Sequence, residues 1–317
     1  MGYSAGDTIL DDEYNVFVGS STDPFGYNHF AGPGAGVYGL NQSTISTVSA
    51  GDTIAASQWN ALFTGIDNIA NHTNISITSS SVSAGDTIAI RSALVGDLAN
   101  LAAAVAGGST GATALDTNAV GSSTSGATYN GSATIERSVT FANSATMRAF
   151  FNGGGKLRVD PSCVTGIDGT KDDVFNTLTV TAIGNLDINA QTSTRSGSGQ
   201  TLTTNGLANG FYDLGDSYTT IIKLTSTTSD YTNNTVEVFA KLNAAPATAT
   251  VITIKLIFTD AESDGTFTSN NLDSVPVNPN EAPKAVLALI EVFPDDSQGL
   301  AADIVSASNA QVSNSTS

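Results

Sequence analysis

A seven-residue motif occurs twice in the first third of this 317-residue chain. Val48–Ile54 reads Val-Ser-Ala-Gly-Asp-Thr-Ile and recurs identically at Val82–Ile88, while Ser4–Ile9 repeats its last six residues. Glycine adopts backbone angles that other residues avoid, and Asp or Thr can accept hydrogen bonds from the free N–H groups of a helix's first turn. The motif therefore predicts a turn that starts a helix. The unequal spacing of the copies indicates related modules rather than a regular solenoid.

Each copy is followed by apolar residues at helical spacing. The segments Thr44–Ser49 and Ile75–Ser83, which lead into two of the copies, alternate apolar and hydroxyl residues and predict short strands. Residues 1–106 are therefore expected to form short strand-turn-helix repeats that dock the chain onto a larger assembly. The expected helical stripes are Leu10, Tyr14 and Phe17; Trp59, Leu62, Phe63, Ile66, Ile69 and Ala70; and Leu94, Leu98, Leu101, Ala102 and Val105. Trp59, Leu62, Phe63 and Ile66 are expected to be the packing stripe of the docking region.

The fold class is predicted to be mainly β. Residues 107–134 are rich in Gly, Ser, Thr, Ala and Asn, a composition typical of a linker or extended arm. Residues 135–304 are expected to form a C-terminal antiparallel β-sandwich that is jelly-roll-like, followed by a polar tail over 305–317. The clearest predicted strands are 236–242, 252–258 and 286–292, and short helices are predicted over 146–151 and 171–178.

The charge balance excludes several classes of function. The chain has 29 Asp and Glu against 11 Lys and Arg, which gives a net charge of −18. Nucleic-acid binding requires cations that displace phosphate counterions, so no nucleic acid is expected as a partner. An anionic membrane surface is disfavoured for the same reason, and no apolar run approaches the roughly 18 residues of a membrane-spanning helix, so no membrane insertion is expected.

Several longer sequence blocks lie between residues 4 and 260. They are Gly6–Asn15; Val48–Ile54 with Ser57–Asn60; Val139–Ser144 with Phe150–Val159; Gly210–Leu214; and Ile257–Asp260. Through these blocks the chain resembles a family of virion structural proteins from marine tailed phages, cyanophages especially, often described as tail-fibre-like. The resemblance implies a virion location and a passive structural or receptor-facing role. Copies of the chain, other virion proteins and a host-surface glycan are the implied partners, and the resemblance brings no catalytic residues.

Two other classes of protein fit parts of the sequence. A prokaryotic cell-surface adhesin or S-layer-type protein would have the same Ser/Thr/Asn-rich composition. It would need a non-classical or C-terminal export signal, because Met1–Asp7 has neither the basic nor the apolar region of a secretory signal. A glycan depolymerase would need two carboxylates at the scissile bond. Adjacent acids such as Asp172-Asp173 and Asp295-Asp296 are expected by chance among 29, and a single Trp provides little surface for sugar, so no enzyme is expected.

The residues most often used in catalysis are few. His29 lies in a Gly/aromatic loop and His72 at a predicted helix end, and both are expected to be structural rather than a metal-binding pair. Cys163 is the single cysteine, which excludes a disulfide within the chain. It follows Pro161 closely and is expected to be a small buried hydrophobe rather than a reactive thiol.

Asp260, Glu262 and Asp264 form the sharpest local signal of a metal site. Oxygen ligands at positions 1, 3 and 5, followed by Gly265, match the first half of a calcium loop. Position twelve is Asn271 rather than a bidentate Glu, so the second half does not match. The alternative is an acidic turn that leaves the preceding strand. Calcium is the single cofactor that the sequence suggests.

If the three carboxylates bind calcium, the melting temperature should rise in millimolar calcium and fall in chelator. The expected affinity is weak, on the order of 10⁻⁴–10⁻³ M, because a backbone carbonyl or another chain must complete the ligand set. Asp264→Ala should abolish the difference between the two melts. A melt that chelator leaves unchanged would identify the loop as an acidic turn.

Overall fold

The chain divides into two compact units, each of which is described by itself. The computed structural model describes residues 11–20, 25–31, 40, 43–73, 75–83, 91–106, 115–125, 131–164, 169–228, 231–261, 284–294 and 308–316. The first unit comprises Met1–Asp116, Asn143–Gly155 and Phe293–Val305, and the second comprises Thr117–Ala142, Lys156–Val292 and Ser306–Ser317. Residues 143–155, which we expected inside the β domain, therefore belong with the N-terminal region.

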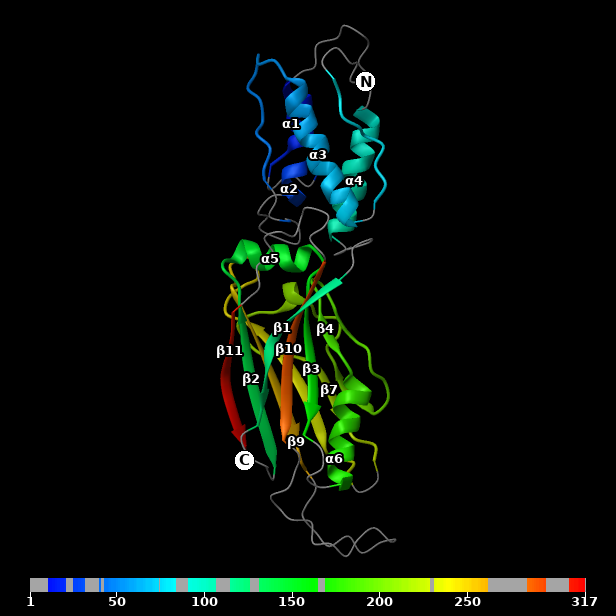
Figure 1. The fold of residues 1–317 in the computed structure, drawn as a ribbon, viewed down its shortest axis with the longest axis vertical. Coiled ribbons are helices and arrows are strands. Elements are labelled where there is room, and N and C mark those ends of the chain that lie inside the picture. Colours follow the sequence, from blue (N-terminus) through cyan, green and yellow to red (C-terminus); the bar gives the residue numbers. More distant parts are fainter. Residues whose placement is uncertain are drawn as a thin grey trace, which may run out of the picture. The chain divides into compact units, whose positions relative to one another are not determined.

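Helices form the first unit (Figure 1). They are α1 (Asp11–Val18), α2 (Tyr27–Ala31), α3 (Ala56–Thr73), α4 (Arg91–Ala106) and α5 (Ser144–Asn152). The apolar stripes predicted for α3 and α4 are buried along one side of each helix, as the helical spacing requires. Trp59 of α3 packs edge-on against Tyr14 of α1 at a ring-centroid distance of 5.1 Å. The helices α1, α3 and α4 therefore share one aromatic and aliphatic core.

The segments expected to be strands before the two complete motifs are extended but unpaired with any described strand. Residues 43–49 and 75–83 have no β assignment. Their apolar side chains nevertheless face the core, because Val48 and Val82 are buried and Ile45, Ile75 and Ile77 pack against the same cluster. The alternation was thus a correct indication of an extended, half-buried backbone and a wrong prediction of sheet pairing.

Helix α5 (Ser144–Asn152) includes the helix predicted over 146–151 and extends beyond it at both ends. The Asn143 side chain accepts a hydrogen bond from the Thr146 backbone N–H at 2.9 Å, which satisfies one free donor of the first turn. The helix stops at Gly153-Gly154-Gly155. A side chain at position 155 would place its Cβ 2.5 Å from the Phe150 carbonyl oxygen, so glycine is required for this close return of the backbone.

Two β-sheets form the second unit. The five-stranded sheet has the order β1 (Leu115–Thr124), β10 (Ala285–Pro294), β3 (Lys156–Cys163), β4 (Leu186–Ile188) and β5 (Ser193–Arg195). The six-stranded sheet has the order β11 (Ser308–Thr316), β2 (Ser132–Thr140), β9 (Val251–Thr259), β8 (Thr235–Leu242), β7 (Thr219–Thr225) and β6 (Thr201–Asn205). The chain connects β3 to β4 through α6 (Gly169–Asn176) and a π-helix, η1 (Thr177–Ile183), and β6 to β7 through a short 3₁₀ turn, η2 (Phe211–Asp213).

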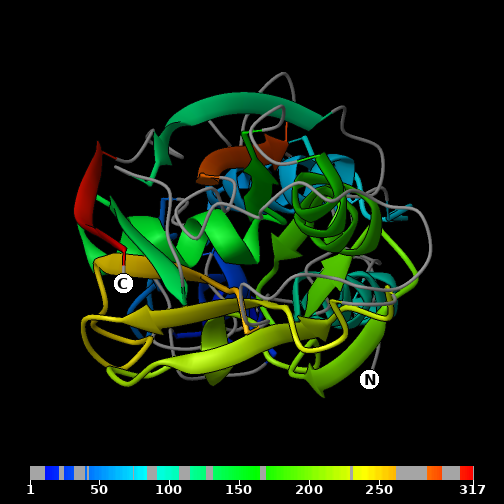
Figure 2. The ribbon, with the colours of Figure 1, turned by 90° about the horizontal axis from the view of Figure 1, so that it is seen from below.

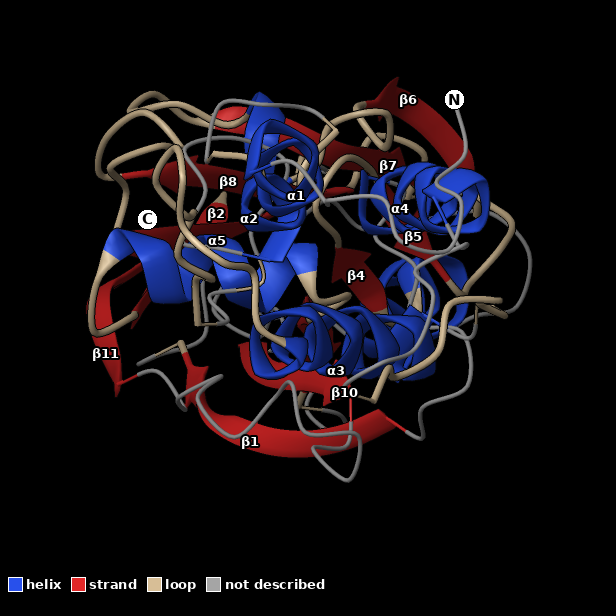
Figure 3. Ribbon diagram, turned by 90° about the horizontal axis from the view of Figure 1, so that it is seen from above, coloured by secondary structure: helices blue, strands red, loops and turns tan. Residues whose placement is uncertain are grey.

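The two sheets lie in two layers, a sandwich-like arrangement (Figures 2 and 3). Side chains alternate between a buried and a partly exposed side along β2, β8 and β9, as expected when one face of a sheet is covered. Arg137 of β2 is on the covered side, and its Nη1 donates a hydrogen bond to the Ser123 hydroxyl of β1. This contact joins the two sheets, and burial lowers the pKa of the Arg137 guanidinium.

Part of the six-stranded sheet is a meander. Strands β6, β7, β8 and β9 follow one another along the chain and are neighbours in one sheet, which is a meander. A jelly roll is built from two Greek keys instead, and the described strands do not show that order. The described strand pairings within both sheets are antiparallel, as predicted.

Strands occur in two segments that the composition marked as irregular. The expected linker, residues 107–134, contains β1 and the first residues of β2. The expected C-terminal tail contains β11, which pairs with β2 over Ser308–Thr316. Both strands lie at a sheet edge, where neighbouring backbone groups supply the hydrogen bonds and few apolar side chains are needed.

Within the described part of the chain, no helix is both long enough and apolar enough to cross a membrane.

Candidate functional site

The structure describes part of the predicted calcium loop. Asp260 directly follows β9, and its side chain is buried. Its backbone N–H donates to the Gly131 carbonyl oxygen at 2.7 Å, and the next N–H, of Ala261, donates to Oδ1 of Asn234 at 2.9 Å. Glu262 and Asp264 lie outside the described residues. Calcium binding therefore stays a prediction, and among the described residues no cluster of three or more His, Cys, Asp or Glu could hold a metal.

The predicted packing stripe is confirmed as a packing stripe, but it lies inside the first unit. Trp59, Leu62, Phe63 and Ile66 are all buried in the core shared with α1 and α4. These side chains stabilise the unit and do not form an exposed surface for a partner. Cys163, expected to be buried, is partly exposed at the end of β3. His29 is partly exposed in α2, and His72 belongs to α3.

Asparagine side chains hold the two extended segments of the first unit. The Val48 backbone N–H donates to Oδ1 of Asn15 at 2.9 Å, and Nδ2 of Asn15 donates to the Val48 carbonyl oxygen at 2.9 Å. Asn60 makes the same pair of bonds with Val82, both at 2.9 Å. We call this arrangement, in which one side-chain amide bonds both backbone groups of one residue, an amide clasp.

A third clasp joins Asn28 of α2 to Ile45. The Ile45 N–H donates to Oδ1 of Asn28 at 2.9 Å, and Nδ2 of Asn28 donates to the Ile45 carbonyl oxygen at 2.8 Å. Asp97 of α4 makes a related contact, since it accepts hydrogen bonds from the backbone N–H groups of Thr78 and Ser79 at 3.0 and 2.8 Å. Helices α1, α2, α3 and α4 therefore each hold an extended segment through one side chain.

The clasps explain how these segments remain extended without a sheet. A primary amide presents one acceptor and two donors, so it can bond an N–H and a C=O as a neighbouring strand would. Backbone polar groups that approach a core must find such partners, because an unsatisfied buried group is costly. The buried valines at 48 and 82 could not lie against the helices if their own backbone groups had no partner.

The sequence carried a signal for two of these clasps that pattern reading missed. Asn15 follows Ile9 of the first motif by six residues, and Asn60 follows Ile54 of the second by six. The asparagine after one copy thus bonds the valine that begins the next copy. The corresponding residue after the third copy is Leu94, which is buried in the core. Alignment of the copies beyond the motif itself would have shown the shared asparagine.

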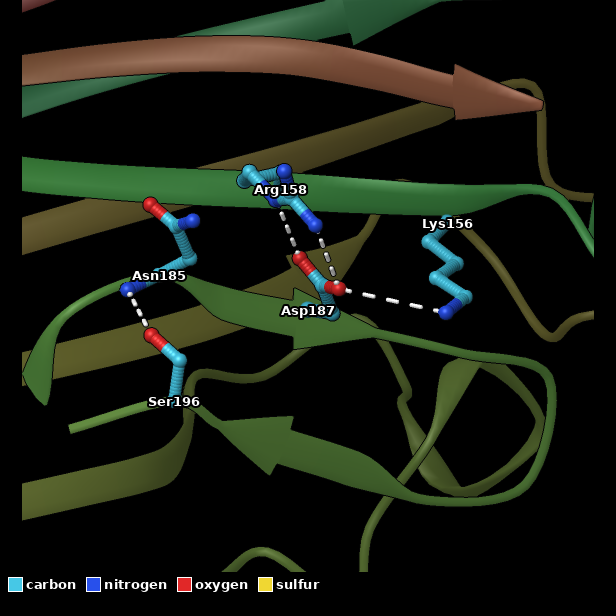
Figure 4. A network of polar contacts seen from close by, with 5 residues as sticks. All are labelled: Lys156, Arg158, Asn185, Asp187 and Ser196. Carbon is cyan, nitrogen blue, oxygen red and sulfur yellow. Dashed lines mark hydrogen bonds and ion pairs between the residues drawn. The ribbon is translucent and has the colours of Figure 1, made fainter. Parts of the chain in front are cut away.

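An ion-pair network lies on the partly exposed side of the five-stranded sheet (Figure 4). Arg158 of β3 stands opposite Asp187 of β4 in the strand register. The guanidinium donates from Nε to one carboxylate oxygen of Asp187 at 2.7 Å and from Nη2 to the other at 3.0 Å. Lys156 Nζ lies 4.0 Å from Asp187. Hydrogen bonding to Asp187 raises the pKa of Arg158, which keeps the guanidinium charged and bound to Asp187.

The end of the π-helix η1 is closed by the residues that follow β5. The carbonyl oxygens of Thr181 and Ile183 accept from the N–H groups of Ser198 and Gly197 at 3.1 and 2.9 Å. The carbonyl oxygen of Ala182 accepts from Arg195 Nη1 at 2.8 Å. π-Helical turns often occur at functional sites, but here the free carbonyls serve to anchor the β4–β5 hairpin. The Asn185 N–H, which donates to the Ser196 hydroxyl at 2.9 Å, completes this anchor (Figure 4).

A lysine–tyrosine cluster lies on the partly exposed side of the six-stranded sheet. We define it by Tyr218, Lys241 of β8 and Lys255 of β9. Lys255 Nζ is 3.8 Å and Lys241 Nζ is 4.4 Å from the Tyr218 ring centroid. Lys255 Nζ also lies 4.7 Å from the ring of Phe239. Burial and the nearby Glu136 carboxylate raise the pKa of the Tyr218 hydroxyl, so the ring stays neutral beneath the two ammonium groups.

Comparison with known proteins found no match among family models, curated proteins or solved structures. The arrangement of the side chains is the remaining guide to function. Arg158 and Lys223 contact oppositely charged groups, Lys255 contacts aromatic rings, and asparagine amides of the first unit bind backbone. Such contacts hold these side chains in fixed positions.

Proposed function

We propose that the chain is a structural component of a tailed-phage virion, in the fibre, neck, baseplate or capsid surface. The observation that carries the proposal is the pairing of two unlike units in one chain. The first is a helical unit whose extended segments are held by amide clasps, and the second is a two-layer β unit. The resemblance of the sequence blocks between residues 4 and 260 to marine phage structural proteins supports the same role.

We infer a division of labour between the units. The first contains extended segments that are each clasped by a helix, and it anchors the chain to the particle. The second is a β-sandwich that projects from the particle or packs against copies of itself. Its partly exposed faces carry hydroxyl side chains beside a small number of paired charges, a surface that remains soluble at high local concentration.

Purified particles provide the test. Mass spectrometry of virions banded by density should find the chain at a fixed ratio to the major capsid protein, and a map of the intact particle should place its β unit. A chain that is abundant in cell extract and absent from purified virions would sink the proposal. Recovery in the host cell envelope instead would favour the adhesin or S-layer-type alternative.

A further inference from the structure

Two Asn–Gly dipeptides with a chemically labile bond lie close together along the β unit. They are Asn205–Gly206, at the end of β6, and Asn209–Gly210, directly before the 3₁₀ turn η2. In such a pair the glycine nitrogen can attack the asparagine side-chain carbonyl carbon, because the glycine has no Cβ to block the approach. Asn205 is exposed and Asn209 is partly exposed, so water reaches both side chains. Both pairs are therefore candidate sites of deamidation, which needs no enzyme.

The reaction would change both charge and backbone length. The glycine nitrogen forms a bond to Cγ of the asparagine and gives its proton to water. The bond from Cγ to Nδ2 breaks, and the side-chain nitrogen leaves as ammonia. Water then opens the cyclic imide, which leaves either aspartate or its β-linked isomer. Both products carry a new negative charge, and the isomer also adds an atom to the backbone.

Glycine is required at both sites, so the chain cannot avoid the labile pairs by replacing it. A Cβ at position 210 would lie 2.3 Å from the carbonyl carbon of Gln191 and 2.4 Å from the nitrogen of Thr192. A Cβ at position 206 would lie 2.1 Å from the carbonyl oxygen of Thr220. These neighbours are backbone atoms, which cannot turn aside as a side chain can. Protection of the two pairs therefore has to come from the contacts around them.

The peptide group between Asn209 and Gly210 is held on both sides. The Gly210 N–H donates to Oδ2 of Asp213 at 2.9 Å. The Asn209 carbonyl oxygen accepts from the Ser193 hydroxyl at 2.7 Å. Attack on Cγ requires the nitrogen to lose its proton and the peptide plane to turn toward the side chain, and both changes break these hydrogen bonds. The bond to Asp213 is charge-assisted, so it contributes the larger share of this restraint.

We propose that the Asp213 carboxylate protects the Asn209–Gly210 pair from deamidation in the folded β unit. The pair leads into η2, where the Phe211 N–H donates to the Asn189 carbonyl oxygen at 2.8 Å. An extra backbone atom at position 209 would displace this contact between η2 and the segment after β4. The proposal does not depend on the role in a virion, and it applies to any setting in which the protein has to persist for a long time.

The Asn205–Gly206 pair provides an internal reference. The Gly206 N–H donates to the backbone carbonyl oxygen of Ile221 at 3.0 Å, so its acceptor is not a side chain. A substitution at Asp213 leaves that acceptor in place. A rate measured at Asn205 in the same sample therefore reports whether the β unit has loosened in general.

Peptide mapping by mass spectrometry, after incubation of the full chain in mildly alkaline buffer, tests the proposal. Asp213→Ala should raise the deamidation rate at Asn209 by about three- to tenfold, the range expected for one partly buried hydrogen bond, and leave the rate at Asn205 unchanged. Asp213→Asn keeps an acceptor oxygen and should give a smaller increase. The matched control is Asp216→Ala, which removes a nearby exposed carboxylate that accepts from the Ser217 hydroxyl and should change neither rate.

Three results would overturn the proposal. The first is an unchanged rate at Asn209 in Asp213→Ala, which would show that the hydrogen bond gives no protection. The second is a lower rate, because the carboxylate would then be accepting the proton of the Gly210 nitrogen and promoting the attack. The third is an equal rise at Asn205 and Asn209, which would assign the effect to general loosening of the β unit.

Discussion

Asn60→Ala should lower the free energy of unfolding of the first unit by about 2–3 kcal/mol. The substitution removes both hydrogen bonds of one amide clasp and leaves the N–H and C=O of Val82 without their partner. Each lost bond costs about 1 kcal/mol, and the unsatisfied backbone groups add to the loss because Val82 is buried. Calorimetry should show the transition of the first unit at lower temperature and that of the β unit unchanged.

Asn71→Ala is the matched control for this experiment. Asn71 is on the same helix, but its side chain is exposed and donates to Asp67 at 3.3 Å. Its loss should change the free energy of unfolding by less than about 0.5 kcal/mol. Asn60→Asp should fall between the two, because it keeps the acceptor and loses the donor. Equal melts for Asn60→Ala and Asn71→Ala would show that the clasp contributes nothing.

Phe258→Ala should destabilise the β unit by about 3–5 kcal/mol. The Phe258 ring is fully buried and stacks on Phe175 of α6, with centroids 5.2 Å apart and planes 6° from parallel. Truncation removes this contact and leaves a cavity that the rigid sheets cannot close. Urea unfolding followed by tyrosine fluorescence would measure the change.

The neighbouring residue provides the control, because it points the other way. Ile257 precedes Phe258 on β9 and lies on the partly exposed side. Ile257→Ala should lower the free energy of unfolding by at most about 1 kcal/mol, because folding removes less of the apolar surface of this side chain from water. If both variants lost the same stability, the assignment of the two faces of β9 would be wrong.

Regular elements with a strong apolar period could be predicted from the sequence. The stretch 252–258 has a large apolar residue at every second position, and it forms β9 with one side buried. The stripe from Trp59 to Ala70 has helical spacing and forms α3. In both cases the pattern that identifies the element also determines which side is buried, so one local signal is sufficient.

Pairing could not be predicted, because it depends on residues far away in the chain. Strands β1 and β11 have little apolar pattern of their own, and their hydrogen bonds come from neighbours selected by the fold. The reverse holds for two extended segments, residues 43–49 and 75–83. Their apolar residues alternate as in a strand, but their backbone groups bond asparagine side chains instead of another strand. The lysine–tyrosine cluster was missed for the same reason, because three separate segments bring it together.

The amide clasps also determine how this chain can change length by gene duplication. Because the asparagine after one copy of the motif holds the valine of the next, each copy depends on the one before it. Unequal crossing-over could insert a whole copy between the second and third. Asn60 would then bond the backbone of the inserted valine, and the inserted asparagine would bond the backbone of Val82. If the same copy were placed after the third, its valine would have Leu94 at the position of the clasping asparagine. Leu94 has no side-chain amide to bond the backbone of that valine. Relatives of different length are therefore expected to gain or lose interior copies and to keep the last one.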